Sequence, residues 1–171
     1  RARPEARFAP FYADTGNIAA DTVQLSGFEA AAVSGSSWIQ GEWIQSKVDA
    51  SALADPRFDG IYIEVGRFLT GETRFYDPTQ AVFGRLRPNS IYKGGNPFRK
   101  TEDRGAFEIT ARFSTIDLND GIIQGGEIRD LSLGLNWYID EVNRVMLNYV
   151  HSDLRNVGKA NLILLRYQFN P

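Results

Sequence analysis

The sequence predicts an all-β protein of antiparallel strands, each with one apolar and one polar face. The stretch GAFEITARFSTIDLNDG, residues 105–121, alternates strictly between apolar and polar side chains from Phe107 to Ser114, which is the period of a strand. Helical periodicity is hard to find, and polar turns recur between the apolar runs. Alternation alone leaves the surroundings open: the apolar face could meet a protein core or lipid, and the polar face bulk water or a water-filled lumen.

The first half of the chain contains four expected strands separated by turn signals. They cover residues 1–7, 22–33, 37–48 and 58–69, with turns at SGSS (34–37) and ADPRFDG (54–60). Within 22–33 the apolar face changes side near Gly27, from Val23 and Leu25 to Phe28 and Ala30. A β-bulge at Gly27 would account for that change.

Residues 70–104 break the alternation. This segment carries three prolines and many charges, and it is too long for a tight turn. We expect an ordered excursion outside the main strands, with a short strand at 81–87.

The last third predicts four consecutive strands, which bring the expected total to eight. They cover residues 105–117, 128–139, 144–152 and 161–169. The turn DEVN (140–143) is short, whereas the links 119–127 and 153–160 read as longer polar loops. Short turns at one end and longer loops at the other are typical of outer-membrane barrels, and this pattern leaves the C-terminus at the short-turn end.

Composition excludes several classes of protein. The 171 residues are 43% hydrophobic and carry a net charge of −2, so nothing suggests nucleic acid as a partner. No window approaches the roughly 20 apolar residues that a membrane helix needs. Cysteine is absent, which removes disulfides and thiol chemistry.

Aromatic residues fall near the expected strand ends more than their centres. This placement is typical of the interfacial girdles of membrane barrels, because amphipathic rings prefer the headgroup level. The expected girdle residues are Trp38, Trp43, Trp137, Tyr138, Tyr149, Tyr167 and Phe169.

Several long stretches resemble one known family. RFLTGETRFYD followed by AVFGRLRP, GAFEITARFSTIDLNDG, and EIRDLSLGLNWYIDEVNRVMLNYVHSDL resemble the phosphate-selective porins O and P; RARPEARF and GFEAAAVSGSSWIQGEW do so more loosely. The resemblance implies a transmembrane antiparallel β-barrel in the outer membrane of a Gram-negative bacterium. It also implies sixteen strands, a homotrimer, lipid and lipopolysaccharide as neighbours, and small anions such as phosphate as solutes.

Under this resemblance the chain corresponds to the C-terminal half of one barrel domain, with 70–104 and the C-terminus on the periplasmic side. Two features depart from the family. Phe169 is followed by Asn170 and Pro171, so the terminal aromatic that assembly machinery reads is displaced. Half a barrel also has two open edges, which lipid does not tolerate, so further strands must exist or these eight must close alone.

The charged face of the strands then becomes the expected lining of the lumen. It comprises Glu108, Arg112, Asp130, Arg144 and Arg166, with Arg1 and Arg3 on one face of the first expected strand. The family uses a ladder of arginines to draw phosphate toward a constriction, and Arg1 and Arg3 are the best candidates for its rungs. Arginine suits this task because its planar fork binds phosphate oxygens in pairs. A general porin, with arginines and carboxylates forming a transverse field, remains an alternative.

Two other functions stay open, and catalysis finds no support. A soluble carbohydrate-binding β-sandwich would use Trp38 and Trp43 as a stacking platform, and a filled eight-stranded barrel would anchor without conducting. DLNDG (117–121) lacks the ligand pattern of a calcium loop, and the chain has one histidine, His151. We therefore expect no enzyme, metal site or cofactor.

Overall fold

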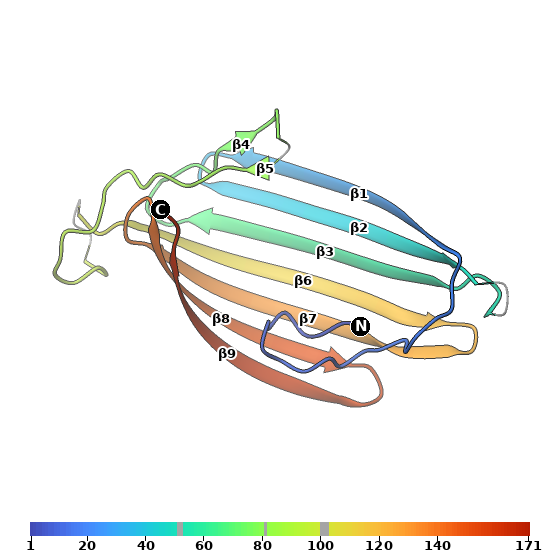
Figure 1. The fold of residues 1–171 in the computed structure, drawn as a ribbon. Helices are drawn as coiled ribbons and strands as arrows, with labels where there is room; N and C mark the ends of the chain where they lie inside the picture. Colours follow the sequence, from blue (N-terminus) through green and yellow to red (C-terminus); the bar gives the residue numbers. More distant parts are fainter. Residues whose placement is uncertain (51–52, 81, 100–102) are drawn as a thin grey trace.

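The computed structural model describes residues 1–50, 53–80, 82–99 and 103–171. They form one long antiparallel sheet and a small hairpin (Figure 1). In this part of the chain no helix is long and apolar enough to span a membrane.

The main sheet has seven strands in the order β1-β2-β3-β6-β7-β8-β9. Their bounds are β1 Thr22–Ser34, β2 Ser37–Asp49, β3 Arg57–Phe68, β6 Ala106–Asp120, β7 Ile123–Tyr138, β8 Asn143–Leu154 and β9 Gly158–Phe169. Each strand pairs with the next one in sequence, apart from the insertion between β3 and β6 that carries the hairpin β4 (Tyr76–Asp77) and β5 (Val82–Phe83). The all-β antiparallel prediction is confirmed.

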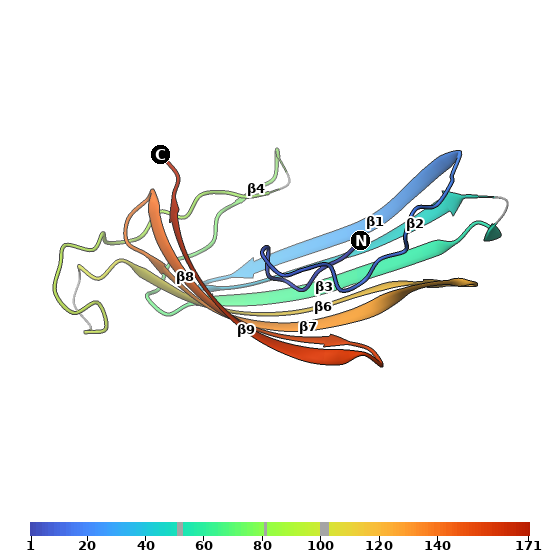
Figure 2. The same ribbon diagram turned by 60° about the horizontal axis from the view of Figure 1, so that its bottom comes forward.

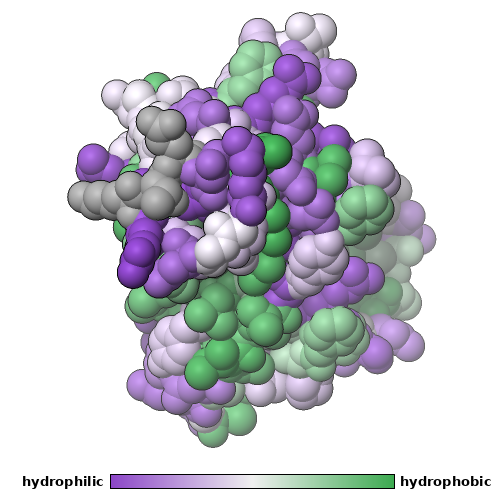
Figure 3. Space-filling view, turned by 90° about the vertical axis from the view of Figure 1, so that its left-hand side faces the viewer, coloured by the Kyte–Doolittle hydropathy of each residue, from purple (hydrophilic) through white to green (hydrophobic). Residues whose placement is uncertain are grey.

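The sheet is curved, and two segments lie on its inner, concave side (Figure 2). The N-terminal residues 1–20 cross it from one end, and the β4–β5 hairpin covers it at the other. A small apolar core of Ala13, Leu118 and Ile128 joins the N-terminal segment to β6 and β7. Seen from the end that carries the C-terminus, hydrophobic side chains gather in the lower middle of the view, with hydrophilic ones above and around them (Figure 3).

Residues 1–7 do not form the predicted strand. One isolated bridge, between Ala2 and Ala13, is the β-structure described there. Pro4 has no N–H to donate to a ladder, and the alternation of Arg1, Ala2 and Arg3 offers little apolar surface for a sheet face. The main sheet therefore has seven strands where eight were expected.

The predicted bulge at Gly27 is wrong. β1 and β2 pair without a register shift from Thr22 and Asp49 to Ser34 and Ser37. Side chains on both faces of β1 are exposed along nearly the whole strand, so its apolar pattern changes side without any change in the backbone. The register shift in this sheet lies elsewhere, between Asp117 and Asn119.

The expected long loops at 119–127 and 153–160 are also wrong. β6 and β7 continue to Asp120 and Ile123, and β8 and β9 to Leu154 and Gly158. Gly121 with φ +54° and Asn156 with φ +62° make the reversals tight. We call this end the hairpin rim. The opposite end, the C-terminal rim, holds the short turns after β1 and β7, the end of β9 and the long insertion after β3.

The predicted short strand at 81–87 is partly present. β5 covers Val82–Phe83, residues 84–87 have no strand structure, and residue 81 lies outside the described residues.

Candidate functional site

Four side chains form a row across the concave face. Gln40 of β2 lies opposite Glu64 of β3, Glu64 opposite Arg112 of β6, and Arg112 opposite Ser132 of β7. Gln40 Nε2 donates to Glu64 Oε2 at 3.0 Å, and Arg112 lies 3.3 Å from the same oxygen. The register places opposite charges on directly facing positions, where cross-strand pairs interact best.

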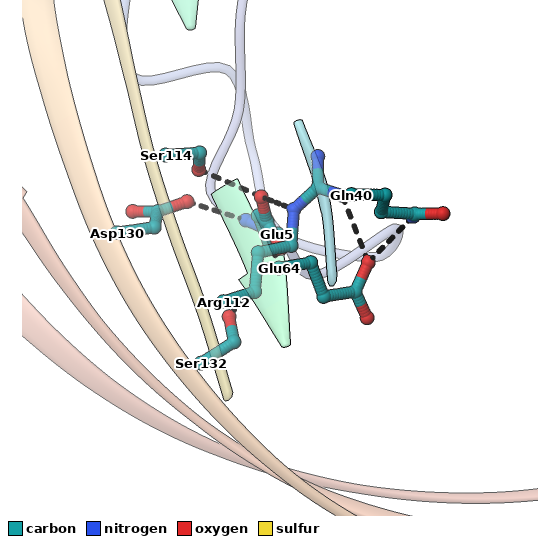
Figure 4. Close-up of polar contacts among 7 residues, drawn as sticks. All are labelled: Glu5, Gln40, Glu64, Arg112, Ser114, Asp130 and Ser132. Atoms are coloured by element: carbon teal, nitrogen blue, oxygen red, sulfur yellow. Dashed lines mark hydrogen bonds and ion pairs between the residues drawn. The ribbon is translucent and has the colours of Figure 1, made fainter. Parts of the chain in front are cut away.

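Glu5 of the N-terminal segment binds the centre of this row (Figure 4). Its Oε1 accepts from Arg112 Nε at 2.5 Å and from Ser114 Oγ at 2.6 Å. Its backbone N–H donates to Asp130 Oδ2 at 2.7 Å. Arg112 also stacks on Tyr62, with the guanidinium carbon 3.7 Å from the ring centroid. The segment is thus held to two strands of the sheet, β6 and β7, through one residue.

A second cluster surrounds Glu108, which is 2% exposed. Its carboxylate accepts from Trp38 Nε1 at 2.8 Å, Asn136 Nδ2 at 2.8 Å and Tyr138 Oη at 2.9 Å. Arg144 donates to Tyr138 Oη at 3.0 Å and to Gln168 at 2.7 Å. A buried carboxylate is stable only with such donors, so this cluster fixes the concave face near the C-terminal rim.

Arg74 lies against the second cluster from the insertion between β3 and β6. Its guanidinium carbon is 3.9 Å from the Trp38 ring and 4.2 Å from the Phe83 ring. This stacking holds the β4–β5 hairpin on the concave face. A cavity of about 320 Å³ next to it is lined in part by Arg74, Arg85 and Arg144.

The remaining predicted arginines also lie on the concave side. Arg1 and Arg3 line a cavity of about 540 Å³ together with Arg112. Arg1 pairs with Asp14 at 2.9 Å, and Arg3 stacks on Phe11 at 4.1 Å. The Gly16 N–H and then Arg1 hold the pKa of Asp14 below its usual value. Arg166 of β9 is exposed and lies opposite Met146, and no ion pair of Arg166 occurs among the described residues.

Glu108 and Asp130 are on the predicted face, but neighbouring groups cover both. Asp130 is 3% exposed, and its Oδ1 has no hydrogen-bond partner in the described part of the chain. In this structure the two carboxylates hold other groups in place instead of facing water. Among the described residues no three His, Cys, Asp or Glu side chains converge closely enough to hold a metal ion.

Comparison with known proteins identifies the family of this chain. Residues 1–170 match the protein family described as "phosphate-selective porin O and P". The chain belongs to that porin family. A 146-residue stretch is 25% identical to Porin O of Pseudomonas aeruginosa, covering 79% of this chain and 31% of that protein. An uncharacterized protein of Caulobacter vibrioides is 35% identical over 123 residues, covering 72% of this chain and 23% of its own length.

The chain therefore spans about a quarter to a third of the curated relatives that it matches, a smaller share than one half. Membership in a porin family favours a channel over an enzyme.

In this porin chain the expected aromatic girdle divides between the two faces. Trp43, Trp137, Tyr149, Tyr167 and Phe169 lie on the convex side with Ile63 and Leu133, by strand register. Trp38 and Tyr138 lie on the concave side and bind Glu108, so the structure corrects their assignment to an outward girdle. Position near a strand end does not reveal which face a ring occupies.

Sequence reasoning missed the residues that hold the inward segments. Glu5 and Glu64 were not singled out, nor were Gln40 and Arg74. Glu64 and Arg112 become neighbours only through the register between β3 and β6, across an insertion of nearly forty residues. The one available signal was RARPEARF, whose single acid sits among three arginines.

Proposed function

We propose that this chain forms part of the wall of an outer-membrane pore through which small hydrophilic solutes diffuse passively. The supporting observation is the division of the sheet into two faces. Leu131, Leu133, Leu147, Ile163 and Leu165 are all 45–78% exposed on the convex side. The row from Gln40 to Ser132, the Glu108 cluster, the N-terminal segment and the β4–β5 hairpin occupy the concave side (Figure 2). An apolar outside and a polar inside suit lipid and a water-filled lumen respectively.

The inward segments support a constricted lumen. The N-terminal segment enters from the hairpin rim and is held by Arg112, and the β4–β5 hairpin enters from the C-terminal rim and is held by Trp38. Together they occupy the hollow side of the sheet (Figure 2).

An anion preference is the finer part of the proposal. On the concave side, Arg3, Arg144 and Arg166 have no ion pair among the described residues, whereas Arg1 pairs with Asp14 and Arg112 with Glu5 and Glu64. The carboxylates of Glu108 and Asp130 are covered. Arginines that face water attract phosphate and remain charged at every relevant pH. The name of the Porin O and P family agrees with phosphate as solute.

The proposal extends to the assembly and its orientation. By family likeness we place the C-terminal rim on the periplasmic side and the hairpin rim toward lipopolysaccharide, in a homotrimer. The chain then forms the C-terminal part of one barrel domain, with residues 70–104 at the periplasmic rim.

The alternatives fit the structure less well. A carbohydrate-binding sandwich needs a second sheet against the first, and the described residues supply only the two-stranded β4–β5. Trp38 and Trp43 also point to opposite faces, so they make no common platform. A filled eight-stranded barrel would need the sheet to close on itself, and no pairing between β1 and β9 occurs among the described residues.

Planar-bilayer recording of the protein purified from its native membrane tests this function. We expect stepwise conductance and a reversal potential that shows anion preference. Replacing Arg1 and Arg3 by Gln should lower that preference by about twofold, because two lumen charges are lost. Arg155→Gln, at the hairpin rim, is the control and should leave it unchanged. Electrically silent membranes would rule out the channel, and pores indifferent to phosphate would rule out the selective version.

A further inference from the structure

The insertion between β3 and β6 divides at the C-terminal rim. Its first part carries Arg74 and Phe83 onto the concave face. Its second part, residues 89–99 and 103–105, contacts the opposite side, and we call it the outer arm. Tyr92 meets Trp137 edge-on with ring centroids 5.0 Å apart, and Phe98 lies 5.8 Å from Phe107. Phe107 and Trp137 face each other on the convex side.

The outer arm is fixed in place by hydrogen bonds. Tyr92 N–H donates to the Ile139 carbonyl at 2.8 Å, and Trp137 Nε1 donates to the Arg104 carbonyl at 2.9 Å. Within the arm, Lys93 pairs with Asp103 at 2.9 Å. Gly105 has φ +73°, and a Cβ there would lie 2.3 Å from the Tyr138 carbonyl oxygen. The chain therefore passes closely over the strand end, and the arm has a defined position outside it.

The surface of the outer arm combines exposed apolar groups with cations. Phe98 is 76% exposed and Ile91 is 48% exposed. Lys93, Arg99 and Arg104 supply three positive charges against the one carboxylate of Asp103 among the arm's described residues. Below these groups, Phe107 and Trp137 stack with an interplanar angle of 6°. A membrane interface with anionic headgroups binds surfaces of this kind, because the aromatic rings enter the acyl chains and the flanking cations meet the headgroups.

We propose that the outer arm anchors the C-terminal rim in the membrane interface by binding the headgroups of anionic phospholipids. Phe98 enters the acyl boundary, and Lys93, Arg99 and Arg104 meet phosphate groups. The inference rests on the proposed function, because it requires the convex face to meet lipid. It goes beyond that function by assigning the second part of the insertion to the membrane, outside the solute path.

Single-cysteine labelling tests the anchor, because the chain has no cysteine of its own. Phe98→Cys receives an environment-sensitive fluorophore in the native-length protein, reconstituted in phosphatidylcholine vesicles with and without phosphatidylglycerol. Quenching by headgroup-level spin-labelled lipid is compared with quenching by aqueous iodide. Two controls carry the same label: Leu165→Cys on the convex strand face and Ile122→Cys at the hairpin rim, where the native side chains are 76% and 80% exposed.

We expect iodide to quench the label at position 98 about threefold less than the label at position 122, and spin-labelled lipid to quench it strongly. Phosphatidylglycerol should increase the lipid quenching. Lys93→Gln with Arg99→Gln should remove that increase, whereas Arg155→Gln at the other rim should not.

Each of the other possible outcomes contradicts one part of the proposal. If position 98 is open to iodide while position 165 is quenched by lipid, the anchor is wrong and the membrane barrel stands. If iodide reaches both positions, the membrane barrel itself is wrong. A label at 98 that neither quencher reaches means that protein covers the arm, and equal quenching in both vesicle types excludes the charge recognition.

Discussion

One glycine, Gly66, leaves the space that the Glu108 cluster needs. Gly66 of β3 lies opposite Trp38, and the indole ring covers the glycine so closely that a Cβ there would lie 2.3 Å from it. This position of Trp38 aims its N–H at Glu108. Because residue 66 has no side chain, Trp38 can lie where its N–H donates to the buried carboxylate of Glu108 on the neighbouring strand.

We expect Gly66→Ala to displace Trp38 and to lower the free energy of unfolding by about 1–3 kcal/mol. The added methyl group overpacks the site, and the buried carboxylate of Glu108 loses a hydrogen-bond donor. Thermal unfolding in detergent, followed by tryptophan fluorescence, measures the change. Gly158→Ala is the matched control, because a Cβ there would meet nothing within 4 Å. Equal unfolding midpoints for the two variants would contradict this account.

The turn between β7 and β8 shows how one side chain sets an element's end. Asp140 accepts from the backbone N–H groups of Val142 and Asn143, each at 2.8 Å, and from the Asn143 side-chain amide at 2.8 Å. The Asn143 amide, followed by these N–H groups, holds the pKa of Asp140 below its ordinary value of 3.8. The folded turn therefore favours the charged form.

The sign of the pH effect follows from that lowered pKa. The stabilisation is complete above the ordinary aspartate pKa, near pH 4, and is lost as the pH falls through the lower folded value. Asp140→Ala should cost about 1 kcal/mol at neutral pH, a modest amount because the turn is solvated. The difference from the unsubstituted protein should shrink at about pH 2. Unfolding in urea at both pH values checks this, and Asp140→Asn, which keeps an acceptor oxygen, should lose less. A pH-independent difference would show that charge is not involved.

Sequence reasoning predicted strands better than their ends. Alternation located β2, β3 and β8 to within about two residues. It failed at 119–127 because polar side chains such as Asn119 and Asp120 were taken for a loop, whereas they extend the strands beyond the apolar band. It failed at 1–7 because alternation of Arg and Ala imitates a strand without a ladder partner. The site depended on register, and the link between Glu64 and Arg112 cannot be read from spacing along the chain.

In the part of the chain that the structure describes, the main sheet has two open edges, β1 and β9, and these edges decide whether it can form a membrane wall alone. β1 pairs with β2 on one side and β9 with β8 on one side, and no second partner for either occurs in the described residues. Half of the backbone N–H and C=O groups of each edge strand therefore point outward. Such groups are very costly in lipid, where no water can satisfy them. A membrane wall built on this sheet thus requires further strands beside β1 and β9.

Amide hydrogen exchange, resolved residue by residue on the protein in its native membrane extract, tests that requirement. In an unpaired edge strand, alternate amides exchange rapidly, because every second N–H faces outward. If further strands complete the barrel, consecutive amides of β1 and β9 should be protected as well as those of β6 and β7, which have partners on both sides. Alternating fast and slow amides within Gly158–Phe169 would mean that β9 is a true edge, and the continuous barrel wall would then be wrong.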